Sequence, residues 1–111
     1  VQIELYQMQQ FARFLETLKS IREPDSDGTL LDNTMALLGS GMGNANSHTN
    51  NDLPIILAGG GFRHSGYRQH PRESNKRIPL CNLYASMLQR FGVETDRFST
   101  GTGTLTGLEW A

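Results

Sequence analysis

Two short apolar runs, separated by a long polar stretch, constrain the fold of this chain more than any other feature of its sequence. The first run covers residues 34–39, the second covers residues 53–58, and turn-forming residues bound both. Short continuous apolar runs of this kind are typical of strands buried on both faces, as in a parallel sheet. Pro54 fits this interpretation because a proline costs least at the first position of a strand. We therefore predict two buried, parallel strands that lie side by side.

Amphipathic patterns before and after these runs predict two helices. In residues 2–22 apolar side chains recur at spacings of three and four, and Pro24 begins a turn that ends the pattern. This long N-terminal helix is predicted to face a hydrophobic core. A C-terminal helix is predicted over residues 79–91, with Pro79 at its first position and Gly92 in the left-handed position that follows its end. Helices that flank buried strands make the expected fold class α/β.

The length and composition indicate one domain with a small core. The chain has 111 residues, of which 37% are apolar. A chain of this length forms a single domain, residues 1–111, and buries roughly 60–70% of the surface that its unfolded form exposes. We therefore expect a homo-oligomer, or a missing N-terminal segment, to complete the core. Because the helical pattern is already under way at Val1, we expect the chain to be the C-terminal part of a larger protein.

Charge and hydropathy exclude two classes of partner. The formal net charge is −1, so the chain has no broad positive field that would attract nucleic acid. No apolar run approaches the length that a membrane-spanning helix needs. The single cysteine, Cys81, lies in an apolar helical pattern and is interpreted as a small buried hydrophobe rather than a nucleophile. The sequence therefore predicts neither a nucleic-acid partner nor a membrane span.

Polar residues follow both predicted strands, where open α/β sheets place their ligand sites. In the first loop, His48 offers an imidazole that can bind a transition metal, although a solvated or capping histidine is the alternative. In the second loop, His64 and Arg68 can recognise a phosphate, sulfate or carboxylate, and a solvated basic loop is the alternative. The candidate binding residues are Ser40, Asn44, Asn46, Asp52, His64 and Arg68.

Several strings along the chain carry a family resemblance. They are DGTLLDNT at residues 27–34, GSGMG at 39–43, His48, and DLPIILAGGG at 52–61, followed by residues 79–83 and 99–101. Together they resemble the C-terminal region of the HXXSHH-motif proteins, a bacterial family of unknown function that is usually exported. That family is distantly similar to the alkaline phosphatase and sulfatase superfamily. The resemblance implies a fragment of an alkaline-phosphatase-like sheet, a periplasmic or secreted location, and a divalent metal in the intact protein.

The resemblance leaves two expectations for function. In the superfamily, a histidine on the loop before a late strand binds metal, and His48 is similar in setting. The acidic ligands usual at the end of the preceding strand are replaced here by residues 39–42. We therefore expect a non-catalytic or degenerate member. The alternative is the C-terminal piece of a metal-dependent phosphate or sulfate ester hydrolase, with His48 as a metal ligand. Activity of the intact protein stays open, and this fragment alone is not expected to be an enzyme.

Overall fold

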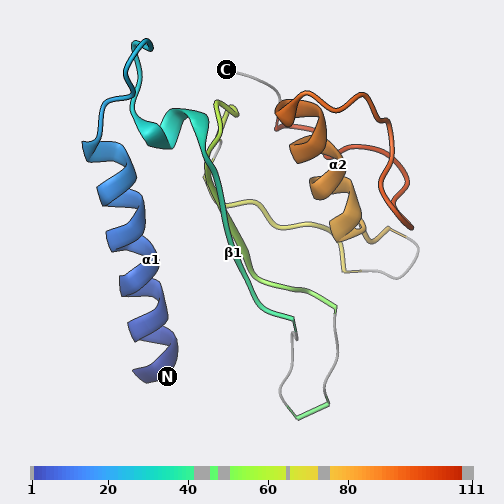
Figure 1. Cartoon of the computed structure of the whole chain (residues 1–111). Helices are drawn as coiled ribbons and strands as arrows, with labels where there is room; N and C mark the ends of the chain where they lie inside the picture. The colour runs from blue at the N-terminus through green and yellow to red at the C-terminus, as the bar shows by residue number, and fades with distance from the viewer. Residues whose placement is uncertain (1, 42–45, 48–50, 65, 73–75, 109–111) are drawn as a thin grey trace. The chain divides into compact units, whose positions relative to one another are not determined.

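Helices flank a two-stranded ladder along the chain (Figure 1), which confirms the mixed α/β class. A computed structural model describes residues 2–41, 46–47, 51–64, 66–72 and 76–108. The chain divides into two compact units, Val1–Gly60 and Gly61–Ala111. The prediction of a single domain stays a prediction. The elements are helix α1 (Gln2–Ser20), the short 3-10 helix η1 (Leu30–Asn33), strands β1 (Met35–Gly39) and β2 (Ile55–Gly59), and helix α2 (Leu80–Phe91).

The two strands pair side by side, as predicted, but they run antiparallel. Met35 lies opposite Gly59 at one end of the ladder, and Gly39 lies opposite Ile55 at the other. The prediction of parallel strands is therefore wrong. A parallel pair needs a crossover connection, usually a helix that covers one face of the sheet. Residues 40–52 are almost all small or polar and lack a helical stripe, so this connection does not offer the crossover helix that a parallel pair needs.

The strands are also less buried than their composition predicts. Ala36 is their one buried residue, at 6% exposed, while Ile56 is 36% exposed. Within the described residues the sheet has two strands, so each strand is an edge. Burial on both faces, which the apolar runs predict, requires a cover on each side that a ladder of this size does not have. The prediction of two buried strands is therefore wrong for this chain.

Helix α1 has the predicted start and ends two residues early, but its apolar stripe does not face a core. None of its residues is buried, and the side chains of Leu5 and Phe14 are 57% and 51% exposed. Within its unit, α1 packs against η1, which is only four residues long. A single turn cannot cover a stripe that runs the length of a 19-residue helix. The predicted helix is confirmed, and its predicted core-facing role is wrong.

The end of β2 is attached to η1 by close backbone contacts. Gly59 has φ +75°, and a Cβ at this position would lie 2.3 Å from the carbonyl oxygens of both Leu31 and Thr34. The N–H of Gly60 donates a hydrogen bond to the same Leu31 carbonyl at 3.2 Å. Such a close approach in a left-handed conformation requires glycine. The start of β1 and the end of β2 are therefore held together by one short turn.

Helix α2 ends in the predicted cap. Gly92 has φ +103° and its N–H donates to the Gln89 carbonyl, while the N–H of Val93 donates to the Leu88 carbonyl at 2.9 Å. These two bonds define a Schellman motif, which satisfies carbonyls that the helix end leaves open. At the other end, Pro79 is the cap rather than the first helical residue.

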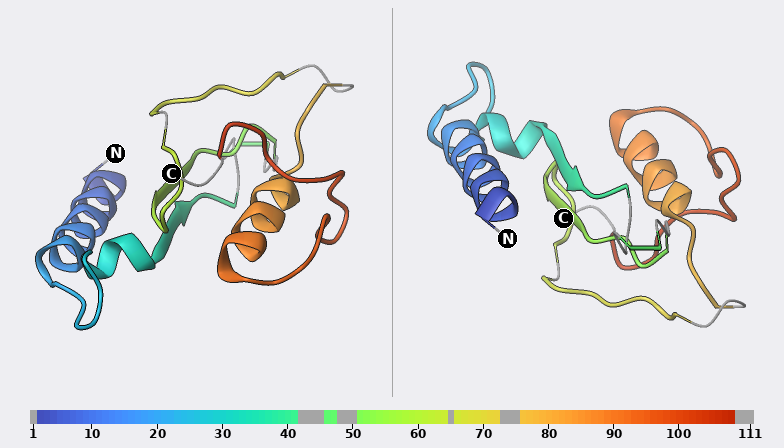
Figure 2. Two further views of the ribbon diagram at one scale, coloured as in Figure 1. Left: turned by 90° about the horizontal axis from the view of Figure 1, so that it is seen from above. Right: turned by 90° about the horizontal axis from the view of Figure 1, so that it is seen from below.

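The C-terminal tail, residues 98–108, runs back along α2 and covers one of its faces (Figure 2). The rings of Tyr84 and Phe98 meet edge to face at 6.0 Å between centroids. Leu83 and Ala85 are buried in this unit. Among the described residues, neither helix is both long and apolar enough to cross a membrane.

Candidate functional site

Two of the predicted binding residues, Ser40 and Asp52, lie at or near the end of the ladder where residues 40–54 connect the strands. The N–H of Ser40 donates a hydrogen bond to the carbonyl of Pro54 at 3.4 Å, which extends the ladder by one position. Asp52 adopts a left-handed conformation with φ +57°, and Ser40, Asn46 and Asp52 are all exposed. The antiparallel pairing therefore places Ser40 and Asp52 at the same end of the ladder, close to solvent.

The residue at the centre of the metal hypothesis is not part of the described structure. His48 and Asn44 both lie outside the described residues, so their predicted roles stay predictions. In the part of the chain that is described, no group of three or more His, Cys, Asp or Glu side chains is placed to hold a metal ion.

The antiparallel ladder changes which predicted site residues can share one edge. In a parallel sheet, the loops after both strands would meet at the carboxyl edge. Here residues 40–54 leave one end of the ladder, and the chain that follows Gly59 leaves the opposite end (Figure 1). The parallel arrangement predicted that the first loop and the basic second loop start from a common edge of the sheet. In the antiparallel ladder they start from opposite ends.

In the second unit, the two predicted anion-binding residues have local partners. The exposed His64 ring meets the buried Phe62 ring edge to face, with 6.2 Å between centroids. The Nη1 of Arg68 donates a hydrogen bond to the carbonyl oxygen of Thr106 at 2.8 Å. A Cβ on neighbouring Gly107 would collide with the Arg68 guanidinium. Arg68 therefore joins the basic segment to the C-terminal tail, and its other guanidinium donors remain on an exposed side chain.

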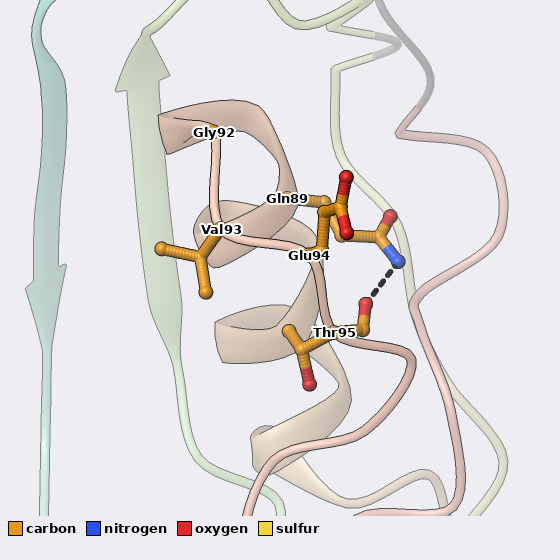
Figure 3. A pocket seen from close by; sticks show the side chains of 5 residues that line it. All are labelled: Gln89, Gly92, Val93, Glu94 and Thr95. Carbon is orange, nitrogen blue, oxygen red and sulfur yellow. Dashed lines mark hydrogen bonds between the residues drawn. The ribbon is translucent and has the colours of Figure 1, made fainter.

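An open hollow of about 430 Å³ follows the C-terminal end of α2 (Figure 3). The Gln89 side chain crosses it and donates from Nε2 to the Thr95 carbonyl at 2.6 Å. The Thr95 hydroxyl donates to the Arg97 carbonyl at 2.6 Å. These polar groups shape the turn after the helix, and the hollow has one carboxylate, that of Glu94. Its lining is Gln89, Gly92, Val93, Glu94 and Thr95.

Two buried polar residues of α2 hold the tail, and sequence reasoning missed them. Asn82 forms a two-way contact with Thr102: its Nδ2 donates to the hydroxyl at 3.1 Å, and its Oδ1 accepts from the N–H at 2.9 Å. One turn later, the Ser86 hydroxyl accepts the N–H of Leu105 at 2.9 Å. The signal in the sequence was a pair of polar residues four positions apart on an otherwise apolar helix face. Buried polar side chains of this kind need hydrogen-bond partners, which the backbone of a covering segment can supply.

The sequence indicated an incomplete core, but it did not locate the exposed apolar surface in the first unit. The α1 stripe and both apolar runs were assigned to a core, whereas most of their side chains are half-buried or exposed. The low apolar content of the chain was the signal, since it indicated that some of this surface lacks a matching layer.

The chain matches no protein-family model, no curated protein sequence and no solved structure. The resemblance to the HXXSHH-motif proteins therefore rests on the strings quoted above and stays a prediction. The fold is that of a mixed α/β chain of two compact units, and the sheet of the first unit has two strands within the described residues.

Proposed function

We propose that this chain is a non-catalytic protein-binding segment whose two-stranded ladder joins a sheet completed by another polypeptide. The observation that carries the proposal is the ladder itself, since both of its strands are edges within the described residues. Neither strand contains a charged residue or an interior proline, the devices by which proteins usually protect edges from pairing. An extended apolar segment from a partner is the chemistry that such an edge accepts.

Both faces of the ladder support the same proposal. Alternate residues of a strand point to opposite faces, and residues paired across a ladder share a face. One face carries Ala36, Leu38, Ile56 and Ala58, and the other carries Met35, Leu37, Ile55 and Leu57. A sheet that is solvated on one side alternates apolar with polar residues. This ladder is apolar on both sides, so its composition suits the interior of a larger sheet.

The register indicates which backbone groups a partner strand would meet. The Ser40 N–H donates to the Pro54 carbonyl, so this pair is a hydrogen-bonded position of the ladder. Hydrogen-bonded and non-bonded pairs alternate along antiparallel strands. The amides of Leu38 and Ile56 therefore point inward, and those of Leu37 and Leu57 point toward the two edges.

The proposal extends the family expectation of a degenerate, exported member. It is supported by residues 39–42, which stand where the superfamily usually supplies acidic ligands. It is also supported by the antiparallel ladder, in which the chain leaves β1 and β2 at opposite ends. A role in binding another polypeptide needs no convergence of ligands.

Amide hydrogen exchange on the isolated chain, followed by NMR at low concentration, tests the proposal. The inward amides of Leu38 and Ile56 should exchange slowly, while those of Leu37 and Leu57 should exchange nearly as fast as in an unfolded peptide. A synthetic peptide with the sequence of residues 34–40 then serves as a strand probe. In excess it should slow exchange at Leu37 or Leu57, and the same peptide carrying Leu37→Pro should not. Protection of both edge amides without the probe, or no change with it, contradicts the proposal.

The hydrolase alternative makes an opposite prediction. If His48 binds a metal for ester hydrolysis, the chain incubated with zinc or manganese should retain about one ion per molecule after dialysis and should hydrolyse generic phosphate or sulfate esters. The His48→Ala variant should lose both properties. We expect no turnover of these esters by the metal-treated chain, and hydrolysis that His48→Ala abolishes would overturn the non-catalytic assignment.

A further inference from the structure

The side of α1 that carries Leu5 and Met8 is exposed in the N-terminal half of the helix and half-buried in the C-terminal half. The two side chains are 57% and 43% exposed. Phe11, Leu15 and Leu18 continue the stripe at the spacing of helical turns and are half-buried. A helix of 19 residues is roughly 28 Å long, so the stripe is long enough for helix-on-helix packing over several turns.

The order of residues along this stripe is close to a palindrome. Positions at equal distances on either side of a centre between Phe11 and Ala12 are both apolar. A two-fold antiparallel contact requires this symmetry, because it places each such position opposite its counterpart. In such a contact, Leu5 lies opposite Leu18, Met8 opposite Leu15, Phe11 opposite Ala12, and Glu4 opposite Lys19 of the second copy.

Charge favours this arrangement over the parallel one. Antiparallel packing places the Glu4 carboxylate beside the Lys19 ammonium at both ends, whereas parallel packing places each charge beside its own kind. The antiparallel pair also sets the positive end of one helix dipole beside the negative end of the other. Helix α1 carries two acidic residues, Glu4 and Glu16, and two basic ones, Arg13 and Lys19, so it has no net charge that would draw it to an anionic membrane.

We infer that α1 is a self-association surface, on which a second copy of this chain packs antiparallel to form a two-fold symmetric dimer. The contact is distinct from the strand edges of the proposed function. It uses the apolar stripe and the two symmetry-related pairs formed by Glu4 and Lys19. The association would cover Leu5 and Met8, which are exposed in the single chain, and would complete the burial of Leu15 and Leu18.

Sedimentation equilibrium of the full chain, with charge-swapped variants, tests the inference. The unaltered chain should form dimers at micromolar to submillimolar concentration. Glu4→Lys and Lys19→Glu should each weaken the dimer about tenfold, because each replaces two attractive contacts by two repulsive ones. The double variant Glu4→Lys/Lys19→Glu should restore dimerisation, since its reversed charges again meet opposite partners.

Two controls separate this contact from a general effect of charge or folding. Arg13→Glu makes the same charge change as Lys19→Glu on the side of the helix opposite the stripe, and it should leave dimerisation unchanged. Circular dichroism should show equal helix content in all variants. Met8→Asp should abolish the dimer.

Three outcomes would overturn the inference. They are a chain that stays monomeric up to about 1 mM, a dimer that is indifferent to the charge swaps, and a monomer that binds anionic lipid vesicles through α1. None of them affects the exchange of the Leu37 and Leu57 amides, so failure of the dimer is distinguishable from failure of the proposed function.

Discussion

The two units of the chain differ in how far they bury their helices. Helix α1 in the first unit has 19 residues and none is buried, whereas α2 in the second unit has 12 residues and four are buried. The difference does not follow from the length or the amphipathic pattern of the helices, since both have an apolar face. It follows from what each unit provides to cover that face. The buried residues of α2 are Asn82, Leu83, Ala85 and Ser86.

The second unit covers its helix with the chain's own tail. The backbone N–H groups of Thr102 and Leu105 donate hydrogen bonds to the side chains of Asn82 and Ser86. These tail amides are therefore satisfied while the tail lies on an otherwise apolar face. The first unit offers α1 only a short turn. The comparison shows that a periodic stripe predicts a helix, while the cover of α2 depends on two polar residues of the helix itself, Asn82 and Ser86.

Truncation of one leucine in each helix should give the largest contrast between the units. Leu83→Ala removes a side chain that is 7% exposed and should destabilise the second unit by about 3 kcal/mol. Leu5→Ala removes a side chain that is mostly exposed and should change the stability of the monomer by less than about 0.5 kcal/mol. Site-resolved amide exchange at low protein concentration measures both. Equal losses in the two units would remove the contrast drawn here.

A smaller effect is expected at the turn that ends β2 in the first unit. Gly59→Ala places a Cβ against two carbonyl oxygens in a left-handed conformation, and it should cost about 2 kcal/mol. Gly41→Ala is the matched control, because its Cβ would meet nothing within 4 Å, and it should be nearly neutral. Exchange of the Leu38 and Ile56 amides reports the difference. If Gly59→Ala proves as mild as its control, the first unit is looser than the structure indicates.

The smallest effect is expected for Arg68 in the second unit. Arg68→Ala removes the hydrogen bond to the Thr106 carbonyl and should cost less than about 1 kcal/mol, since the side chain is exposed. Exchange of tail amides near residues 105–107 should quicken. Arg63→Ala removes the same charge from the same segment and should leave those amides unchanged. If Arg68→Ala instead abolishes sulfate or phosphate binding and leaves the tail amides unchanged, the role of Arg68 is anion recognition rather than attachment of the tail.

Much of the fold was predictable from local patterns. The 3.6-residue periodicity located both helices to within two residues, and Gly92 indicated the Schellman cap that the structure contains. The two apolar runs located both strands and predicted that they pair. These features depend on residues close together in sequence, and such residues carry their own signal.

The orientation and the burial of the strands were not predicted correctly. Apolar runs show what a strand is able to bury, but burial depends on neighbouring layers that local sequence does not specify. The connection between the strands lacks a helical pattern and so favours an antiparallel return, whereas the prediction of parallel strands rested on the continuous apolar runs. Of the predicted site residues, Ser40 and Asp52 do lie at one end of the ladder, while Arg68 has a structural contact that no motif revealed.

The passage from the first unit to the second runs through three consecutive glycines, Gly59, Gly60 and Gly61, with φ values of +75°, +74° and +74°. Proteins are built from L-amino acids, and these three residues have the positive φ angles that D-amino acids favour. Among the residues of natural proteins, only achiral glycine adopts these angles three times in succession without strain. D-alanines substituted there by chemical synthesis should be accepted more readily than L-alanines, which makes this short stretch a place where the backbone favours residues of the opposite chirality.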